Sequence, residues 1–149
     1  MRRHMLTEWM LARMLSWSKA HSEAHNLEHA ISTEVEDALL RDWEDPETCP
    51  HGNPLPGHEA YVAGWQPLVQ IPVGETVTIR RVHELGEETT GLLAFLEEKG
   101  LLPGKPVTVV EGLPFNQTIT LRIENRDVSL GYASAQYIFV QPGSPDQTE

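Results

Sequence analysis

The sequence has a single cysteine, Cys49, and no hydrophobic run that approaches the roughly 18 residues of a membrane-spanning helix. One cysteine excludes an internal disulfide and suits a reducing compartment. Met1-Arg2-Arg3-His4 leads into an amphipathic segment, not into the apolar core of a signal peptide. The hydrophobic fraction of 40% and the four tryptophans nevertheless favour a folded chain. These features predict a cytoplasmic protein with no membrane association.

Positive charge is also scarce. Eleven lysines and arginines face 22 acidic residues, which gives a net charge of −11. Only Arg2-Arg3 and Arg80-Arg81 are adjacent in the sequence. Duplex DNA requires clustered cations that displace its condensed counterions. The chain taken alone is therefore expected to bind DNA poorly and to suit cations better.

What the sequence does contain is a histidine-rich stretch between Lys19 and Ile31. Read as a helix at about 100° per residue, it places four side chains within an arc of about 100°. These side chains are His21, His25, Glu28 and His29. Imidazole and carboxylate are ligands of divalent metal ions. A second stripe of Ala20, Ala24, Leu27 and Ile31 is apolar. The sequence therefore predicts a helix with a metal-binding edge beside a packing edge.

Two further helices are predicted around this stretch. Residues 3–15 form the first, with His4 and Glu8 one turn apart. Ser18 is predicted to cap the histidine-rich helix, and Ser32 or Thr33 to cap the third. The exposed apolar stripes of three short helices predict pairing with a second copy of the chain. The expected interface residues are Leu27, Ile31, Val35, Leu39 and Trp43.

The segment 45–57 holds four prolines and two glycines, which excludes a helix or a central strand. We predict an ordered, extended connector there. The predicted organisation is a helical domain over residues 1–60, a linker over 61–66, a small domain over 67–141 and a disordered tail over 142–149. Cys49, His51 and His58 are an alternative zinc site, but the closely spaced Pro and Gly residues make a poor tetrahedral cage and favour a structural role for this segment.

The second half of the chain shows strand-like periodicity. Strands are predicted at Thr76–Val82, Pro106–Glu111, Thr118–Glu124 and Tyr137–Val140, with a helix at Thr90–Lys99. Short strands with one small helix predict an SH3-like barrel. The predicted fold class is therefore α+β, with a three-helix N-terminal domain followed by this barrel.

The segment His21–Ser32, followed by Glu34-Val35-Glu36, and the segment Cys49–Gly57 together resemble the diphtheria-toxin-repressor family of metal-dependent transcriptional regulators. The resemblance covers the dimerisation domain of the family (about 3–60) and its C-terminal FeoA-type SH3-like domain (about 67–141). It implies a homodimer that binds divalent metal ions.

The resemblance also implies two metal sites. An ancillary site would use His4, Glu8 and His21, and a carboxylate of the second domain would complete it, either Glu87 or Glu88. A primary site would use His25, Glu28 and His29. Family members often have cysteine or an oxygen ligand where this chain has His25. Imidazole suits several metals, so we expect Fe²⁺ or Mn²⁺ in the cell, with Zn²⁺, Co²⁺ or Ni²⁺ possible in vitro.

Members of this family begin with a winged helix-turn-helix that binds DNA, and this chain starts where that domain should end. We therefore expect a metal-sensing, dimerising module with little affinity for operator DNA unless a winged helix is supplied. Two alternatives stay open. The chain could be a FeoA-like protein-interaction module, or a small metal-dependent enzyme. The enzyme is disfavoured because no general base accompanies the ligands and no Gly-rich phosphate loop is present.

Overall fold

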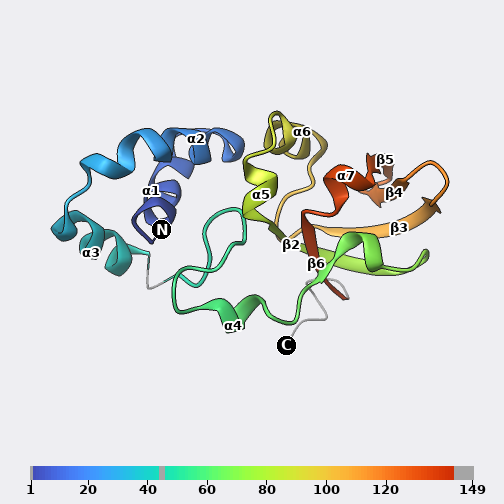
Figure 1. Cartoon of the computed structure of the whole chain (residues 1–149), viewed down its shortest axis with the longest axis horizontal. Coiled ribbons are helices and arrows are strands. Elements are labelled where there is room, and N and C mark those ends of the chain that lie inside the picture. Colours follow the sequence, from blue (N-terminus) through green and yellow to red (C-terminus); the bar gives the residue numbers. More distant parts are fainter. Residues whose placement is uncertain (1, 44–45, 143–149) are drawn as a thin grey trace. The chain divides into compact units, whose positions relative to one another are not determined.

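The computed structural model describes residues 2–43 and 46–142 and divides into two compact units, Met1–Ala63 and Gly64–Glu149 (Figure 1). Within the described residues, no helix has the length and apolar character needed to cross a bilayer. The predicted tail over 142–149 lies outside the described residues, apart from Pro142.

The first unit is helical. Its elements are α1 (Arg2–Ala12), α2 (Trp17–Leu27), the 3₁₀ turn η1 (Glu28–Ala30), α3 (Thr33–Asp42) and α4 (Glu59–Val62). The predicted cap of the third helix is confirmed, because the Ser32 side chain accepts a hydrogen bond from the Val35 N–H at 3.2 Å. The predicted cap of the second helix is wrong, since Ser16 takes that position in place of Ser18. The short helix α4 lies in a segment predicted to lack regular structure.

The connector is ordered, as predicted, and it folds back on itself. A β-bridge pairs Thr48 with Pro54, and the Leu55 N–H donates to the Glu47 carbonyl at 3.0 Å. Its apolar side chains then join the helices in one core. That core consists of the buried residues Met5, Leu6, Cys49 and Leu55, with Leu39 and Leu40 packed against it. The connector is therefore a structural part of the helical unit.

The second unit is built on an antiparallel sheet. Its strands are β1 (Gln66–Pro67), β2 (Thr76–Val82), β3 (Pro106–Leu113), β4 (Thr118–Ile123), β5 (Arg126–Gly131) and β6 (Ile138–Pro142). Among the described residues these form one six-stranded sheet in the order β1-β6-β2-β3-β4-β5. The short helical elements of this unit are η2 (Leu68–Gln70), α5 (Glu84–Glu87), α6 (Leu92–Lys99) and α7 (Tyr132–Ala135). The predicted α+β fold class is confirmed.

Strand β5 was missed by the sequence analysis. It pairs with β4 over its whole length, from Thr118 opposite Gly131 to Ile123 opposite Arg126. The two strands are joined by a tight turn in which Glu124 and Asn125 have φ values of 49° and 69°. Positive φ at both central residues gives a turn that matches the right-handed twist of a hairpin.

Gly86 lies inside α5 at a position with no room for a side chain. A Cβ added there would lie 2.8 Å from Tyr137 Cβ and 3.1 Å from Val82 Cγ1. We expect Gly86→Ala to lower the free energy of unfolding of the second unit by about 1–3 kcal/mol, because the neighbours must shift. Chemical denaturation would measure the change.

The matched control is Gly64→Ala. Among the described residues, no heavy atom lies within 4 Å of a Cβ built at Gly64, and its φ is not in the left-handed region. This substitution should leave stability unchanged or raise it slightly, because alanine restricts the unfolded chain. Equal stability of the Gly86→Ala variant and the wild type would contradict the packing described for α5.

Candidate metal centre

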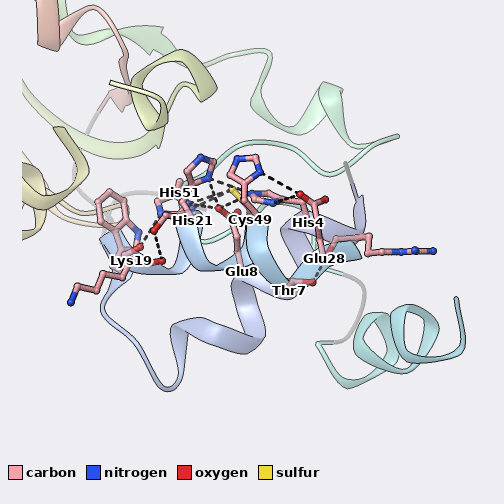
Figure 2. A network of polar contacts seen from close by, with 12 residues as sticks. His4, Thr7, Glu8, Lys19, His21, Glu28, Cys49 and His51 are labelled. Atoms are coloured by element: carbon pink, nitrogen blue, oxygen red, sulfur yellow. Dashed lines mark hydrogen bonds and ion pairs between the residues drawn. The ribbon is translucent and has the colours of Figure 1, made fainter. Parts of the chain in front are cut away.

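The buried carboxylate of Glu8 is the centre of a polar cluster in the helical unit (Figure 2). Its Oε2 lies 2.8 Å from His21 Nδ1, 3.2 Å from His4 Nε2 and 3.5 Å from His51 Nδ1. His4 and Glu8 come from one turn of α1, His21 comes from α2, and His51 comes from the connector. Three imidazoles from three segments therefore meet one carboxylate oxygen.

The charges of this cluster are mutually stabilised. Burial alone would raise the pKa of Glu8, but its hydrogen bonds with His21 and His4 outweigh that effect and lower the pKa far below its usual value. For His4, burial lowers the pKa, whereas the hydrogen bond to Glu8 and the charges of Glu8 and Glu28 raise it, and the net shift is upward. Glu8 is thus held as an anion.

Cys49 and His51 are functional candidates that the sequence analysis set aside. Both are buried, and Cys49 Sγ lies 4.0 Å from His51 Nδ1. The turn that holds them is closed by a hydrogen bond from the Cys49 N–H to the Asn53 carbonyl at 2.8 Å. The connector brings these two side chains to Glu8 because it folds back on the helices. The Cys49-Pro50-His51 sequence indicated two possible metal ligands, but it could not indicate that Glu8 on α1 would lie beside them.

Two donor sets in this unit fit a metal ion. In the first, the buried site, Glu8, Cys49 and His51 each offer a ligand atom, and these atoms lie within 4.8 Å of one another. The second set is named the outer site. Its ligand atoms come from His4, His21 and His25, and they also lie within 4.8 Å of one another. A carboxylate, a thiol and imidazoles are the groups that bind first-row transition metals. The donor chemistry therefore fits a divalent transition-metal ion.

The outer site also includes Glu28. Its Oε1 lies 3.3 Å from His4 Nδ1 and 3.4 Å from His25 Nδ1. The His25 side chain is 53% exposed, so this site opens to solvent, unlike the buried one. The imidazole centroids of His4 and His25 are 4.6 Å apart. Of the predicted primary-site residues, the structure thus brings His25 and Glu28 together.

His29 does not join them in the predicted way, because the helix does not continue to Ile31. The α-helix α2 ends at Leu27, and Glu28–Ala30 form a 3₁₀ turn. A 3₁₀ turn advances each residue by about 120° in place of 100°, so the single metal-binding edge is broken there. His29 lines a pocket of about 420 Å³ together with Arg2, Arg3, Glu28 and Glu36.

The two carboxylates predicted to complete the ancillary site belong to the second unit. Glu87 is the last residue of α5 and is half-buried, and Glu88 follows it and is exposed. Their role as metal ligands stays a prediction.

Helix α5 is capped by His83, which makes the second unit sensitive to pH. The His83 Nδ1 accepts a hydrogen bond from the Leu85 N–H at 3.1 Å, so the cap needs an unprotonated nitrogen. Burial and the charge of Arg81 lower the pKa of His83, against the opposing charges of Glu84 and Glu87. As the pH falls below about 6.5, the unfolded chain binds this proton more readily than the folded one.

The free energy of unfolding of the second unit should therefore decrease from about pH 7 to about pH 5. His83→Asn keeps a side-chain acceptor at the cap and removes the titrating group. Denaturant unfolding at a series of pH values should give a smaller pH dependence for this variant. Identical slopes for variant and wild type would contradict the assignment.

Comparisons with known proteins match both units. Residues 1–57 match the family described as iron dependent repressor, metal binding and dimerisation domain, and residues 66–142 match the FeoA domain. The iron-dependent repressor IdeR of Mycobacterium leprae is 30% identical over 154 residues, covering 95% of this chain and 66% of that protein. The diphtheria toxin repressor of Corynebacterium jeikeium is 39% identical over 143 residues, covering 78% and 60%.

Solved structures agree with these matches. A manganese-dependent transcriptional repressor in complex with manganese is 28% identical with a TM-score of 0.80, covering 95% of this chain and 69% of that one. IdeR of T. acidophilum is 26% identical with a TM-score of 0.79, covering 95% and 65%. ScaR with bound Zn²⁺ is 26% identical with a TM-score of 0.77, covering 94% and 70%. The chain spans between about half and two thirds of the length of the curated relatives named IdeR that it matches.

Proposed function

The chain belongs to the diphtheria-toxin-repressor family of metal-dependent transcriptional regulators, and from that premise we propose that its helical unit senses a divalent transition-metal ion at Glu8, Cys49 and His51. The single observation that carries this proposal is the buried Glu8 carboxylate, which has a thiol and imidazoles around it from three separate segments. A buried carboxylate is costly unless it is paired with positive charge. A bound cation would supply that charge.

The residues of the site have separate tasks. Glu8 provides a fixed negative charge before any ion arrives. Cys49 must lose its thiol proton to act as a ligand, and the imidazole of His51 must be neutral at its coordinating nitrogen. Metal affinity should therefore fall at low pH, because protons compete for the same donor atoms.

The outer site of His4, His21 and His25, with Glu28, is proposed as a second metal position of the same unit. Its ligand atoms share neighbours with the buried site, since His4 contacts both Glu8 and Glu28. Predicted ligands outside these contacts, His29 and either Glu87 or Glu88, are retained as proposals for metal binding.

Iron(II) or manganese(II) is the proposed physiological ion. Relatives are named as iron-dependent and manganese-dependent repressors, and the donor set also suits zinc, cobalt and nickel in vitro. Sites of this type select their ion through its availability in the cell, because affinity alone favours later metals. A cytoplasmic location fits the single cysteine, whose thiol must stay reduced to bind.

We further propose that the chain forms a homodimer through the helical unit. The matched family domain is described as a dimerisation domain. Val35 on α3 is 42% exposed, and Leu27, Ile31 and Leu39 are half-buried, which leaves apolar surface available for a second copy.

Because the net charge is −11 and cations are dispersed, this chain alone should have little affinity for operator DNA. Curated relatives are repressors, so the enzyme alternative is set aside.

Titration of the purified, reduced chain with Co²⁺ tests the proposal. A thiolate-to-cobalt charge-transfer absorption should appear at one equivalent and disappear with chelator, and sedimentation should show a dimer that the ion stabilises. Cys49→Ser should remove the charge-transfer band. Absence of any Co²⁺ binding by the wild type would instead favour a FeoA-like interaction module.

A further inference from the structure

Trp17, the first residue of α2, holds the Cys49-Pro50-His51 turn through three contacts. Its indole N–H donates to the Pro50 carbonyl at 2.9 Å. Its own main-chain carbonyl lies 3.0 Å from His51 Nε2. Its ring lies against the His51 imidazole, with the centroids 4.6 Å apart and the planes at 53°. One residue therefore contacts the turn between the two candidate ligands and one of the ligands itself.

The carbonyl contact decides which nitrogen of His51 carries the proton. A carbonyl oxygen can only accept a hydrogen bond, so Nε2 carries a proton, and in the neutral ring the lone pair therefore lies on Nδ1. That Nδ1 lies 3.5 Å from Glu8 Oε2 and 4.0 Å from Cys49 Sγ. A lone pair directed at a carboxylate oxygen is unfavourable unless a cation lies between them. The tautomer therefore prepares His51 for a metal ion.

We propose that Trp17 is the positioning residue of the buried metal site: it fixes the tautomer and orientation of His51 and the path of the turn that carries Cys49. This inference rests on the proposed metal site at Glu8, Cys49 and His51. Groups that orient a metal-binding histidine through its other ring nitrogen commonly contribute about 10- to 100-fold to metal affinity.

Trp17→Phe tests the part of the inference that depends on the side chain, because it keeps an aromatic ring and the main-chain carbonyl but removes the indole N–H that holds Pro50. The dissociation constant for Co²⁺, measured by absorption titration against a competing chelator, should rise about 10- to 100-fold. Circular dichroism and thermal unfolding would show that the variant is folded. An affinity equal to that of the wild type would overturn the proposal.

Trp9→Phe is the matched control. The Trp9 indole N–H also donates to a carbonyl of the connector, that of Thr48 at 2.7 Å, but its ring lies against Trp43, with the centroids 5.7 Å apart. This variant loses the same kind of hydrogen bond one residue before Cys49. Its Co²⁺ affinity should stay within about threefold of that of the wild type, a much smaller change than the loss expected for Trp17→Phe. A loss as large as that of Trp17→Phe would mean that any anchor of the connector matters equally, which would overturn the specific role of Trp17.

A metal-free measurement separates the inference from the proposed function. In the apo wild type, ¹⁵N NMR of the His51 ring should show a protonated Nε2 and an unprotonated Nδ1, and Trp17→Phe should show the same tautomer because the main-chain carbonyl of residue 17 remains. A mixture in the wild type would overturn the inference even if Co²⁺ binds. Failure of the wild type to bind Co²⁺, together with a single His51 tautomer, would overturn the proposed function and leave the orienting role of Trp17 supported.

Discussion

Glu8→Gln is expected to abolish metal binding at the buried site at micromolar concentrations of ion. The glutamine side chain has nearly the same volume, so the helices can still pack, but the charge that three imidazoles face is gone. A neutral amide oxygen is a much weaker ligand for a divalent ion than a carboxylate, and we expect the loss of binding free energy to be about 3 kcal/mol or more. A loss of that size corresponds to a hundredfold or greater weakening of metal affinity. Isothermal titration with Co²⁺ or Mn²⁺ would measure it.

Glu36→Gln provides the control for this substitution. Glu36 is another nearly buried carboxylate of the same unit, held by Arg2 Nε at 2.6 Å and by Arg3 at 3.1 Å. Its loss should lower stability without changing the affinity of the buried site, because Glu36 is not among the buried-site donors. If Glu8→Gln binds metal as the wild type does, the assignment of Glu8 as the central ligand is wrong.

Leu6→Ala should have the largest effect on stability in the helical unit. Leu6 is fully buried between His4 and Glu8 on α1, and it belongs to the core cluster with Cys49 and Leu55 of the connector. Truncating such a leucine costs about 3 kcal/mol, through lost burial and the cavity left behind. In a unit of this size, that is a large share of the total stability. Denaturant unfolding of the apo chain would measure the loss.

The same variant should also bind metal more weakly, because the connector would be correctly folded in a smaller fraction of molecules. Saturating metal should recover part of the lost stability, about 2.7 kcal/mol at a hundredfold excess over the dissociation constant. Leu121→Ala is the control, since Leu121 is equally buried but lies in β4 of the second unit. Its metal affinity should match the wild type. A similar loss of affinity in both leucine variants would show that Leu6 acts through general destabilisation.

Secondary structure was most predictable where pattern and end signals coincide. Strand β2 runs from Thr76 to Val82 as predicted, because five of its seven residues are β-branched. Helix α6 ends at Lys99 because Gly100 takes a φ of 78°. Strand β5 was missed because Asp127 and Ser129 make it too polar to be recognised as a strand. Pairing with β4 forms this strand, and that pairing is a tertiary contact.

Residue spacing predicted the candidate site only within single helices, and the family resemblance predicted that His21 would join His4 and Glu8. The spacing of His4 and Glu8 on α1 placed them on one face, and the structure brings His21 of α2 to them. The contribution of Cys49 and His51 depends on the return of the connector to α1. That return is fixed by burial of Leu55 and by main-chain hydrogen bonds between residues far from Glu8 in the sequence. No local pattern contains that information.

The fold-back of the connector places Glu8 and His51, which lie near opposite ends of the helical unit's sequence, within 3.5 Å of each other. An ion held by both would act as a removable cross-link in a chain whose one cysteine cannot form an internal disulfide. A permanent bond that closes a loop of about 40 residues raises the free energy of the unfolded chain by roughly 4 kcal/mol at room temperature, through its lost entropy. Metal scarcity would then act first on folding: a cell short of the ion would hold a looser, more protease-sensitive protein.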